Sequence, residues 1–182
     1  MVLLFLLFGK DANSQPFHYL DVGISRSSFN QLSDIYSNNW DLSSVNSIQF
    51  RTPFYIGTAG VGLDFFSYTN KSDNTFEISS LNASAFFGLD AIKTKNFIIS
   101  TGVLIGVQRI EASAEFFGEN PAETELYTAL ALEPQVKLGN FILFTEFQYR
   151  RIFNYYRQNL FTVGLGLKYR IGIGEKLRGF ID

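Results

Sequence analysis

The stretch from Leu160 to Gly174, LFTVGLGLKYRIGIG, alternates two kinds of side chain with a period of two. One set is large and apolar: Phe161, Val163, Leu165, Leu167, Tyr169 and Ile171. The other set is small and then cationic: Thr162, Gly164, Gly166, Lys168 and Arg170. Because successive side chains of a β-strand point to opposite faces, the alternation predicts a long strand with two unlike faces. The rest of the sequence must decide which face is buried and what neutralises the two cations.

Composition narrows the class of protein. The chain has 182 residues, no Cys, one His and a formal net charge of -2, and charged residues make up 18% of it. Typical soluble domains carry roughly 25% charged residues. The near-neutral charge argues against a nucleic-acid partner. The lack of Cys excludes a disulfide framework, a zinc–thiolate cluster and a cysteine nucleophile.

The first residues have the features of a secretory signal peptide. An apolar run over residues 2–8 is followed by a polar stretch with the small residues Ala12 and Ser14. A signal peptidase recognises small residues at this spacing, which predicts a signal peptide over residues 1–14 and a single mature domain over 15–182. The apolar run is shorter than the about 20 residues of a transmembrane helix.

Seven other segments show the same alternation, so the sequence predicts eight strands. They cover residues 17–27, 45–53, 57–69, 75–89, 96–110, 124–138, 141–152 and 159–173. The connections at 28–44 and 112–123 are long, whereas Gly139-Asn140 is a two-residue turn. Long connections that alternate with short ones predict an antiparallel up-and-down sheet with one elaborated end.

Two barrel architectures fit this pattern and differ in which face is buried. In a soluble lipocalin-like barrel, the apolar face points inward around a ligand and the polar face meets water. In a transmembrane barrel, the apolar face meets lipid and the polar face lines the lumen. The polar faces carry mainly Gly, Ala and Ser, which suits the narrow interior of an eight-stranded barrel. The prediction is therefore an all-β, eight-stranded, antiparallel up-and-down transmembrane β-barrel.

With its signal peptide, eight strands and long loops at one end, the chain resembles the small outer-membrane β-barrels of the OmpA/OmpX type. It is similar to the form common as "outer membrane β-barrel domain" proteins of Bacteroidota. The resemblance covers about residues 17–173 and consists of pattern rather than a diagnostic motif. It implies the outer membrane of a Gram-negative bacterium, both termini in the periplasm, contact with outer-membrane lipid and lipopolysaccharide, and insertion by the barrel-assembly machinery.

The function predicted on this basis is structural or adhesive, with no enzymatic activity and no cofactor. Trp40, Phe116 and Phe117 are candidates for contacting an extracellular protein or surface ligand through the outer loops. A narrow porin-like channel for ions or small solutes is the main alternative. A lipid A-modifying enzyme and a soluble lipocalin-like ligand binder are further alternatives. The single histidine, His18, lies at the start of the first strand, where it fits an interfacial anchor better than a catalytic base.

The turn at Gly139-Asn140 fixes the register of the two strands that it joins. Leu138 is then paired with Phe141, and Glu133 lies opposite Glu146 on the lumen face. Two opposed carboxylates have Cβ atoms about 5 Å apart and repel each other if both are charged and alone. Pro134 cannot donate a hydrogen bond to a strand ladder, so a bulge is expected there.

Eight charged side chains are predicted to share the lumen and to balance each other. They are Asp21, Arg51, Asp64, Glu133, Glu146, Arg150, Lys168 and Arg170. An unpaired charge is costly in a space with little water. We therefore expect at least one of the four cations to bridge Glu133 and Glu146 and to close the lumen as an ionic plug.

Overall fold

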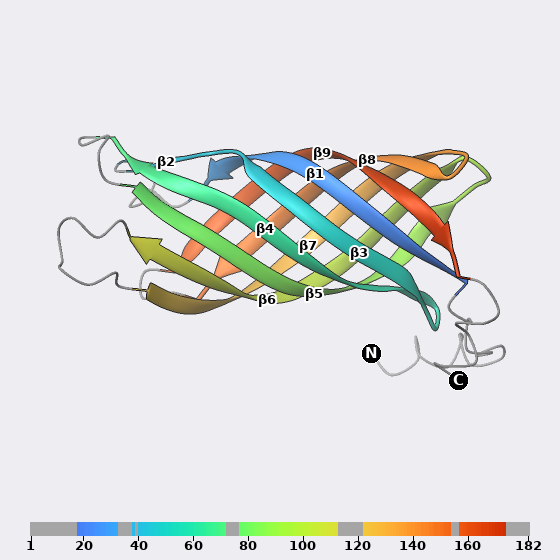
Figure 1. The fold of residues 1–182 in the computed structure, drawn as a ribbon, viewed down its shortest axis with the longest axis horizontal. Helices are drawn as coiled ribbons and strands as arrows, with labels where there is room; N and C mark the ends of the chain where they lie inside the picture. Colours follow the sequence, from blue (N-terminus) through green and yellow to red (C-terminus); the bar gives the residue numbers. More distant parts are fainter. Residues whose placement is uncertain are drawn as a thin grey trace.

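The computed structural model describes residues 18–32, 38, 40–71, 77–112, 122–153 and 157–173. These residues form nine β-strands (Figure 1). The strands are β1 (Tyr19–Gln31), β2 (Trp40–Leu42), β3 (Val45–Phe54), β4 (Gly57–Asn70), β5 (Glu77–Lys93), β6 (Phe97–Ala112), β7 (Ala122–Leu138), β8 (Phe141–Ile152) and β9 (Gln158–Gly172). Within the described residues, no helix has the length and apolar character needed to cross a membrane. The predicted signal peptide, residues 1–14, lies outside the described residues.

The eight long strands close into one antiparallel barrel. Each long strand pairs with the next one along the chain, and β9 pairs with β1 to close the sheet. The short strand β2 pairs only with the end of β4. The predicted fold class, an eight-stranded up-and-down transmembrane β-barrel, is therefore confirmed, with β2 as an addition. We call the end with the turns 55–56, 94–96 and 139–140 the turn end, and the opposite end the loop end.

The strand registers define how steeply the strands tilt. When the paired residues are followed from strand to strand once around the barrel, a path that starts at Asp21 of β1 returns to β1 at Gln31. The stagger is therefore 31 − 21 = 10 residues. Eight strands with this stagger tilt by about 35–45° from the barrel axis and enclose an interior that side chains fill. Side chains from distant strands therefore meet across the lumen.

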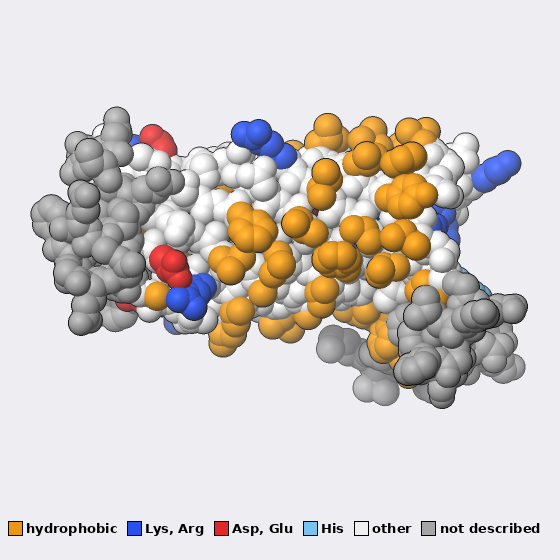
Figure 2. Space-filling view, in the orientation of Figure 1, with side chains coloured by type: hydrophobic (Ala, Val, Ile, Leu, Met, Phe, Trp, Pro, Cys, Tyr) orange, Lys and Arg blue, Asp and Glu red, His pale blue; other side chains and the backbone are white. Residues whose placement is uncertain are grey.

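The apolar face of each strand points outward. Ile24, Ile105, Leu130 and Leu165 are each about three-fifths exposed on the outer wall, at 62%, 63%, 62% and 59%. Figure 2 shows such apolar side chains gathered over the barrel wall. The inward faces carry the buried polar and charged residues. The lipocalin-like alternative, which needs the apolar face inside, is therefore wrong.

Small residues are required on the inward faces because backbone and side-chain atoms of neighbouring strands lie very close to them. A Cβ atom added at Gly102 would lie 2.6 Å from the carbonyl oxygen of Phe87 and 2.6 Å from the ring of Phe86. Even alanine would thus force the wall to move at this position, because real Cβ contacts are longer. The alternation of Gly, Ala and Ser with larger inward residues therefore reflects the narrow barrel that the stagger sets.

Two details differ from the sequence-based expectations. The segment 28–44, expected to be a connection, contains the last residues of β1 and all of β2. Inward-facing Phe29 and half-buried Leu42 pack on an apolar cluster, which explains why strand structure continues into this polar stretch. No bulge occurs at Pro134, because the pairs Leu132–Phe147 and Gln135–Phe144 keep the same register on either side of it. The register shift lies instead between Asp90 and Ile92 of β5.

Arg in place of Leu130 or Val103, two paired outward residues of β7 and β6, tests the outward placement of the apolar face. At mid-membrane, Arg should lower the free energy of unfolding by about 2–4 kcal/mol, because the charge faces hydrocarbon. Arg in place of Leu138, which is 61% exposed at the turn end, should cost only about 0–1 kcal/mol near the membrane interface. Urea titration of the protein in lipid vesicles measures all three values. Equal effects at the three positions would contradict the assignment.

Candidate functional site in the barrel lumen

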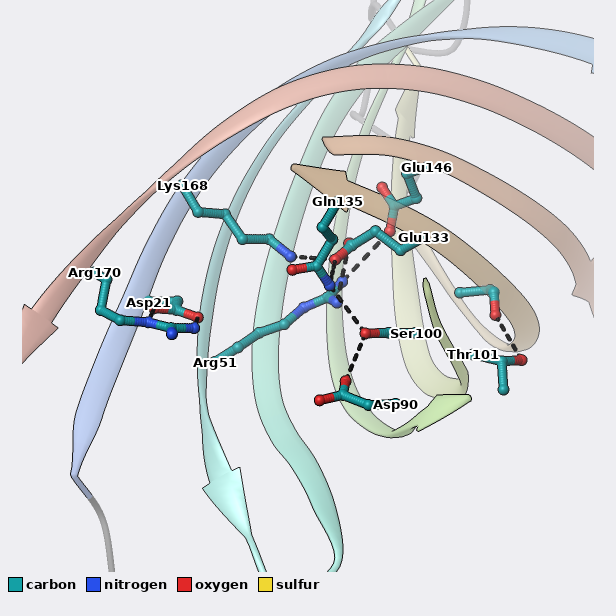
Figure 3. Close-up of polar contacts among 11 residues, drawn as sticks. Asp21, Arg51, Asp90, Ser100, Thr101, Glu133, Gln135, Glu146, Lys168 and Arg170 are labelled. Carbon is teal, nitrogen blue, oxygen red and sulfur yellow. Dashed lines mark hydrogen bonds and ion pairs between the residues drawn. The ribbon is translucent and has the colours of Figure 1, made fainter. Parts of the chain in front are cut away.

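The centre of the lumen holds two acids and two cations from four different strands (Figure 3). Glu133 on β7 and Glu146 on β8 occupy opposed positions, because the register of the Gly139-Asn140 hairpin runs as predicted. Arg51 of β3 lies between them, with Nη1 3.0 Å from Glu133 Oε2 and Nη2 3.5 Å from Glu146 Oε1. Lys168 of β9 donates a hydrogen bond from Nζ to Glu133 Oε1. All four side chains are at most 7% exposed, so the acids are held by cations rather than by water.

A chain of hydrogen bonds extends this central cluster toward the turn end. Gln135 Nε2 donates to Glu133 Oε1 at 2.8 Å and to Ser100 Oγ at 2.9 Å. Ser100 Oγ donates to Asp90 Oδ1 at 2.8 Å, and Lys93 Nζ lies 3.2 Å from Asp90 Oδ2. The chain runs across β5, β6 and β7 and ends on an exposed cation.

Two further ion pairs flank the central cluster, Arg150 with Asp64 toward the loop end and Arg170 with Asp21 toward the turn end. Arg150 Nη2 donates to Asp64 Oδ2 at 2.6 Å and to Gln148 Oε1 at 3.1 Å. Arg170 donates from Nε and Nη2 to the two carboxylate oxygens of Asp21, at 2.8 and 2.7 Å. Such fork-to-fork contacts fix the geometry of both partners. The structure thus brings all eight predicted lumen residues to the inward face and pairs each of them with an opposite charge.

Each of the four predicted lumen cations also lies over an aromatic ring, a feature that the sequence reasoning missed. The ring-centroid distances are 3.9 Å for Arg51 over Phe86, 4.3 Å for Lys168 over Phe144, 4.6 Å for Arg150 over Tyr127 and 3.6 Å for Arg170 over Tyr19. The negative face of an aromatic ring attracts a cation, and more strongly away from water. The signal was present in the sequence, since all four rings belong to residues of inward parity.

A second, apolar layer fills the lumen nearer the loop end. Val45, Phe66 and Tyr68 form one buried cluster, against which Phe29, Trp40, Leu42 and Ile78 pack. Tyr127, Ile152 and Leu160 form a neighbouring cluster and are fully buried. The rings of Phe29 and Phe66 are 4.9 Å apart in an edge-to-face arrangement. We call these two clusters the apolar layer. The six buried residues of the two clusters lie within predicted strands, but the sequence analysis described the inward faces as small residues and isolated charges and so did not find the layer.

Trp40 belongs to this layer rather than to an outward-pointing loop. Its half-buried side chain packs on the cluster of Val45, Phe66 and Tyr68. The other two candidates for loop contacts, Phe116 and Phe117, lie outside the described residues.

Little free volume remains between the two layers. A cavity lined by Arg51, Asp64 and Glu146, among others, measures about 20 Å³, which is close to the space of one water molecule. Among the described residues, no group of three or more His, Asp or Glu side chains is placed to hold a metal ion. The lumen is therefore closed, and its charged groups are engaged with each other.

Replacement of Lys168 by Met tests the central cluster. Removing one partner of a buried pair leaves an uncompensated charge, so we expect a loss of about 3–5 kcal/mol in the free energy of unfolding. Lys71→Met is the control, because Lys71 forms a solvent-exposed pair with Asp41 at 3.4 Å and should cost less than about 1 kcal/mol.

The double variant Glu133→Gln, Lys168→Met separates charge from packing. It leaves Arg51 opposite Glu146 in balance, so its cost should fall well below the sum of the two single variants. Urea titration of all variants in the same vesicles gives the comparison. Additive costs, or equal costs for Lys168→Met and Lys71→Met, would show that the central cluster is not coupled.

Comparisons with solved structures place this barrel among known folds. Ail, the attachment invasion locus protein of Yersinia pestis, is 15% identical with a TM-score of 0.53, over 85% of this chain and 99% of that one. Neisserial surface protein A is 14% identical with a TM-score of 0.53, over 85% and 96%. The outer membrane protein OprG from Pseudomonas aeruginosa is 11% identical with a TM-score of 0.54, over 90% and 100%.

No protein-family model matches the sequence, and no curated protein matches it. The structural likeness therefore rests on geometry: strand number, closure, outward apolar faces and length. The chain has the fold of the small, eight-stranded outer-membrane β-barrels of the OmpA/OmpX type.

Proposed function

We propose that the protein is an integral outer-membrane barrel that serves as a closed scaffold for a binding surface at its loop end, without channel or enzymatic activity. The observation that carries this proposal is the double closure of the lumen. Ion pairs from Arg51 to Glu133 and Glu146 cross the centre of the lumen. The apolar layer fills the lumen between these ion pairs and the loop end. The eight lumen charges then act as the plug that the sequence suggests.

The proposed orientation places the loop end outside the cell and both termini in the periplasm. An even number of long strands brings the start of β1 and the end of β9 to the same end of the barrel, and Ile173 N donates to His18 O at 3.0 Å at the turn end. Outer-membrane barrels have short periplasmic turns and longer external loops. The segments between strands at the loop end, such as 113–121, are longer than the two-residue turns 55–56 and 139–140.

A role in binding at the cell surface is supported by this arrangement. Loops on a rigid scaffold are common sites of recognition. One similar structure is that of Ail in complex with the heparin analogue sucrose octasulfate, at 16% identity and a TM-score of 0.52. We propose an extracellular protein or surface ligand as the partner of the loop end, lipopolysaccharide as a neighbour in the membrane, and the barrel-assembly machinery as the insertion route.

Planar-bilayer recordings distinguish the closed scaffold from the narrow channel. The wild-type protein should give no conductance steps, because two layers block the lumen in series. Lys168→Ala removes a side chain from the central cluster only, and Phe66→Ala removes one from the apolar layer only. Each of these single variants should also give no conductance steps. The combined variant should conduct. Folding of each variant is checked by the change in gel mobility between boiled and unboiled samples. Steps from the wild-type protein would favour the channel alternative.

Epitope insertions test the proposed orientation. A tag inserted after Phe117 should bind antibody on intact cells, because that position lies between two strands at the loop end. A tag inserted after Lys95, between β5 and β6 at the turn end, should bind only after the outer membrane is permeabilised. The reverse pattern would invert the orientation, and equal labelling of both positions on intact cells would contradict membrane insertion.

A further inference from the structure

The apolar surface around the barrel ends earlier on β1 than on β9. Outward-facing residues of β1 are apolar through Ile24 and then change to Arg26, Ser28 and Asn30. Their partners on β9 remain apolar: Leu165 lies opposite Arg26, Val163 opposite Ser28 and Phe161 opposite Asn30. The apolar surface therefore stops three outward positions sooner on β1, roughly 20 Å along the strand. Figure 2 shows a largely white area, with few apolar side chains, between the apolar residues of the wall and the loop end.

The neighbouring strand β3 carries the same change. Ile48 pairs with Ile24 within the apolar surface, and the next outward residue, Asn46, pairs with Arg26. Arg26 Nε donates to Ser44 Oγ at 3.0 Å, so the guanidinium points along the wall toward the loop end. We call Arg26, Ser28, Asn30, Ser44 and Asn46 the polar notch.

Arg26 has no acidic partner within the part of the chain that the structure describes. The nearby outward cation Arg109 differs, because its Nε lies 2.7 Å from Glu111 Oε1. Arg26 therefore supplies the uncompensated positive charge of this face. A charge on the lipid-facing wall is costly unless it reaches the interface or finds a counter-ion.

Two depressions in the outer wall meet at this place and share Asn46 and Phe65. The first, of about 550 Å³, has Arg26 and Asn46 at one side and Ile24, Ile48, Leu165 and Leu167 along the rest. The second, of about 670 Å³, is lined toward the loop end by Ser43, Ser44, Ser67 and Ser79. Together they form a groove that is apolar at the membrane side, cationic at Arg26 and rich in hydroxyl groups beyond it. The Arg109–Glu111 ion pair lines its far side, where the carboxylate is neutralised by its own partner.

We propose that the polar notch binds the phosphate of an anionic lipid from the leaflet at the loop end, with an acyl chain of that lipid in the apolar depression beside Ile48 and Leu165. The inference rests on the proposed membrane location. The guanidinium fork of Arg26 matches a phosphate group in charge and geometry, and Ser28, Ser44 and Asn46 add neutral donors. The apolar lining fits a lipid better than a soluble anion, because it offers hydrocarbon contact below the charge.

Native mass spectrometry of the full chain released from nanodiscs tests the proposal. The nanodiscs contain equal amounts of phosphatidic acid and phosphatidylcholine, and the ratio of the two single-lipid adducts is measured. The wild-type protein should retain phosphatidic acid preferentially, and Arg26→Gln should lower this preference by about fivefold. Asn46→Leu, which keeps the charge but fills the groove, should lower it by less.

Arg151→Gln is the matched control. Arg151 is also an outward-facing arginine without an acidic partner among the described residues, but it lies on β8 beside Phe153, at 5.8 Å from the ring centroid, and outside the polar notch. Its replacement should leave the lipid preference unchanged. Equal losses for Arg26→Gln and Arg151→Gln would show general attraction to anionic lipid and overturn the proposal, as would an unchanged preference in Arg26→Gln.

Two further outcomes separate this inference from its foundation. A wild-type chain that enters nanodiscs and shows the heat-dependent gel shift, but has no lipid preference, would overturn only the lipid site. A chain that fails to insert would overturn the proposed function as well.

A change in the monomer-to-dimer ratio in Arg26→Gln, without a change in lipid preference, would overturn the lipid site and assign the polar notch to a second copy of the chain instead.

Discussion

The narrow interior imposed by barrel closure is the constraint on which the rest of the structure depends. Eight strands with a stagger of ten residues leave room only for side chains that touch across the lumen. A long residue on one strand therefore requires a small one nearby, as at Gly102 beside Phe86. The same closeness brings Arg51 within reach of two carboxylates on the opposite wall. Small residues, ion pairs and cation–ring contacts are thus three results of one geometric condition.

Much of this architecture was predictable because period-two alternation and turn chemistry are local properties. The alternation from Phe161 to Ile171 assigned both faces of β9, and Gly139-Asn140 set the register that opposes Glu133 and Glu146. Non-local contacts were less accessible. The partner of each lumen charge depends on the stagger, and β2 forms because Trp40 and Leu42 pack on residues of β3 and β4. Pro134 was expected to cause a bulge, but the strand keeps its register and forgoes ladder contacts to β8 instead.

The charged lumen defines one arrangement of strands rather than adding much net stability. A buried ion pair often does no better than apolar residues of the same volume, while a mismatched charge is strongly unfavourable. In this barrel, Asp64 with Arg150, and Asp21 with Arg170, join strands with particular registers. A slip of one residue would turn these side chains toward lipid. The lumen charges therefore oppose alternative registers, and the aromatic rings beneath the cations strengthen that preference.

The sequence separation of the central partners has a consequence for assembly. Arg51 and Glu146 are 95 residues apart, and they meet only when β3 faces β8 across a finished barrel. In a sheet that has not yet curled, Arg51, Glu133 and Lys168 would each face the bilayer without a counter-charge. Partly assembled forms are thus penalised in the membrane, whereas the closed form is not. Insertion and closure should then occur as one cooperative step, with the β1–β9 seam forming together with the charge pairs rather than after them.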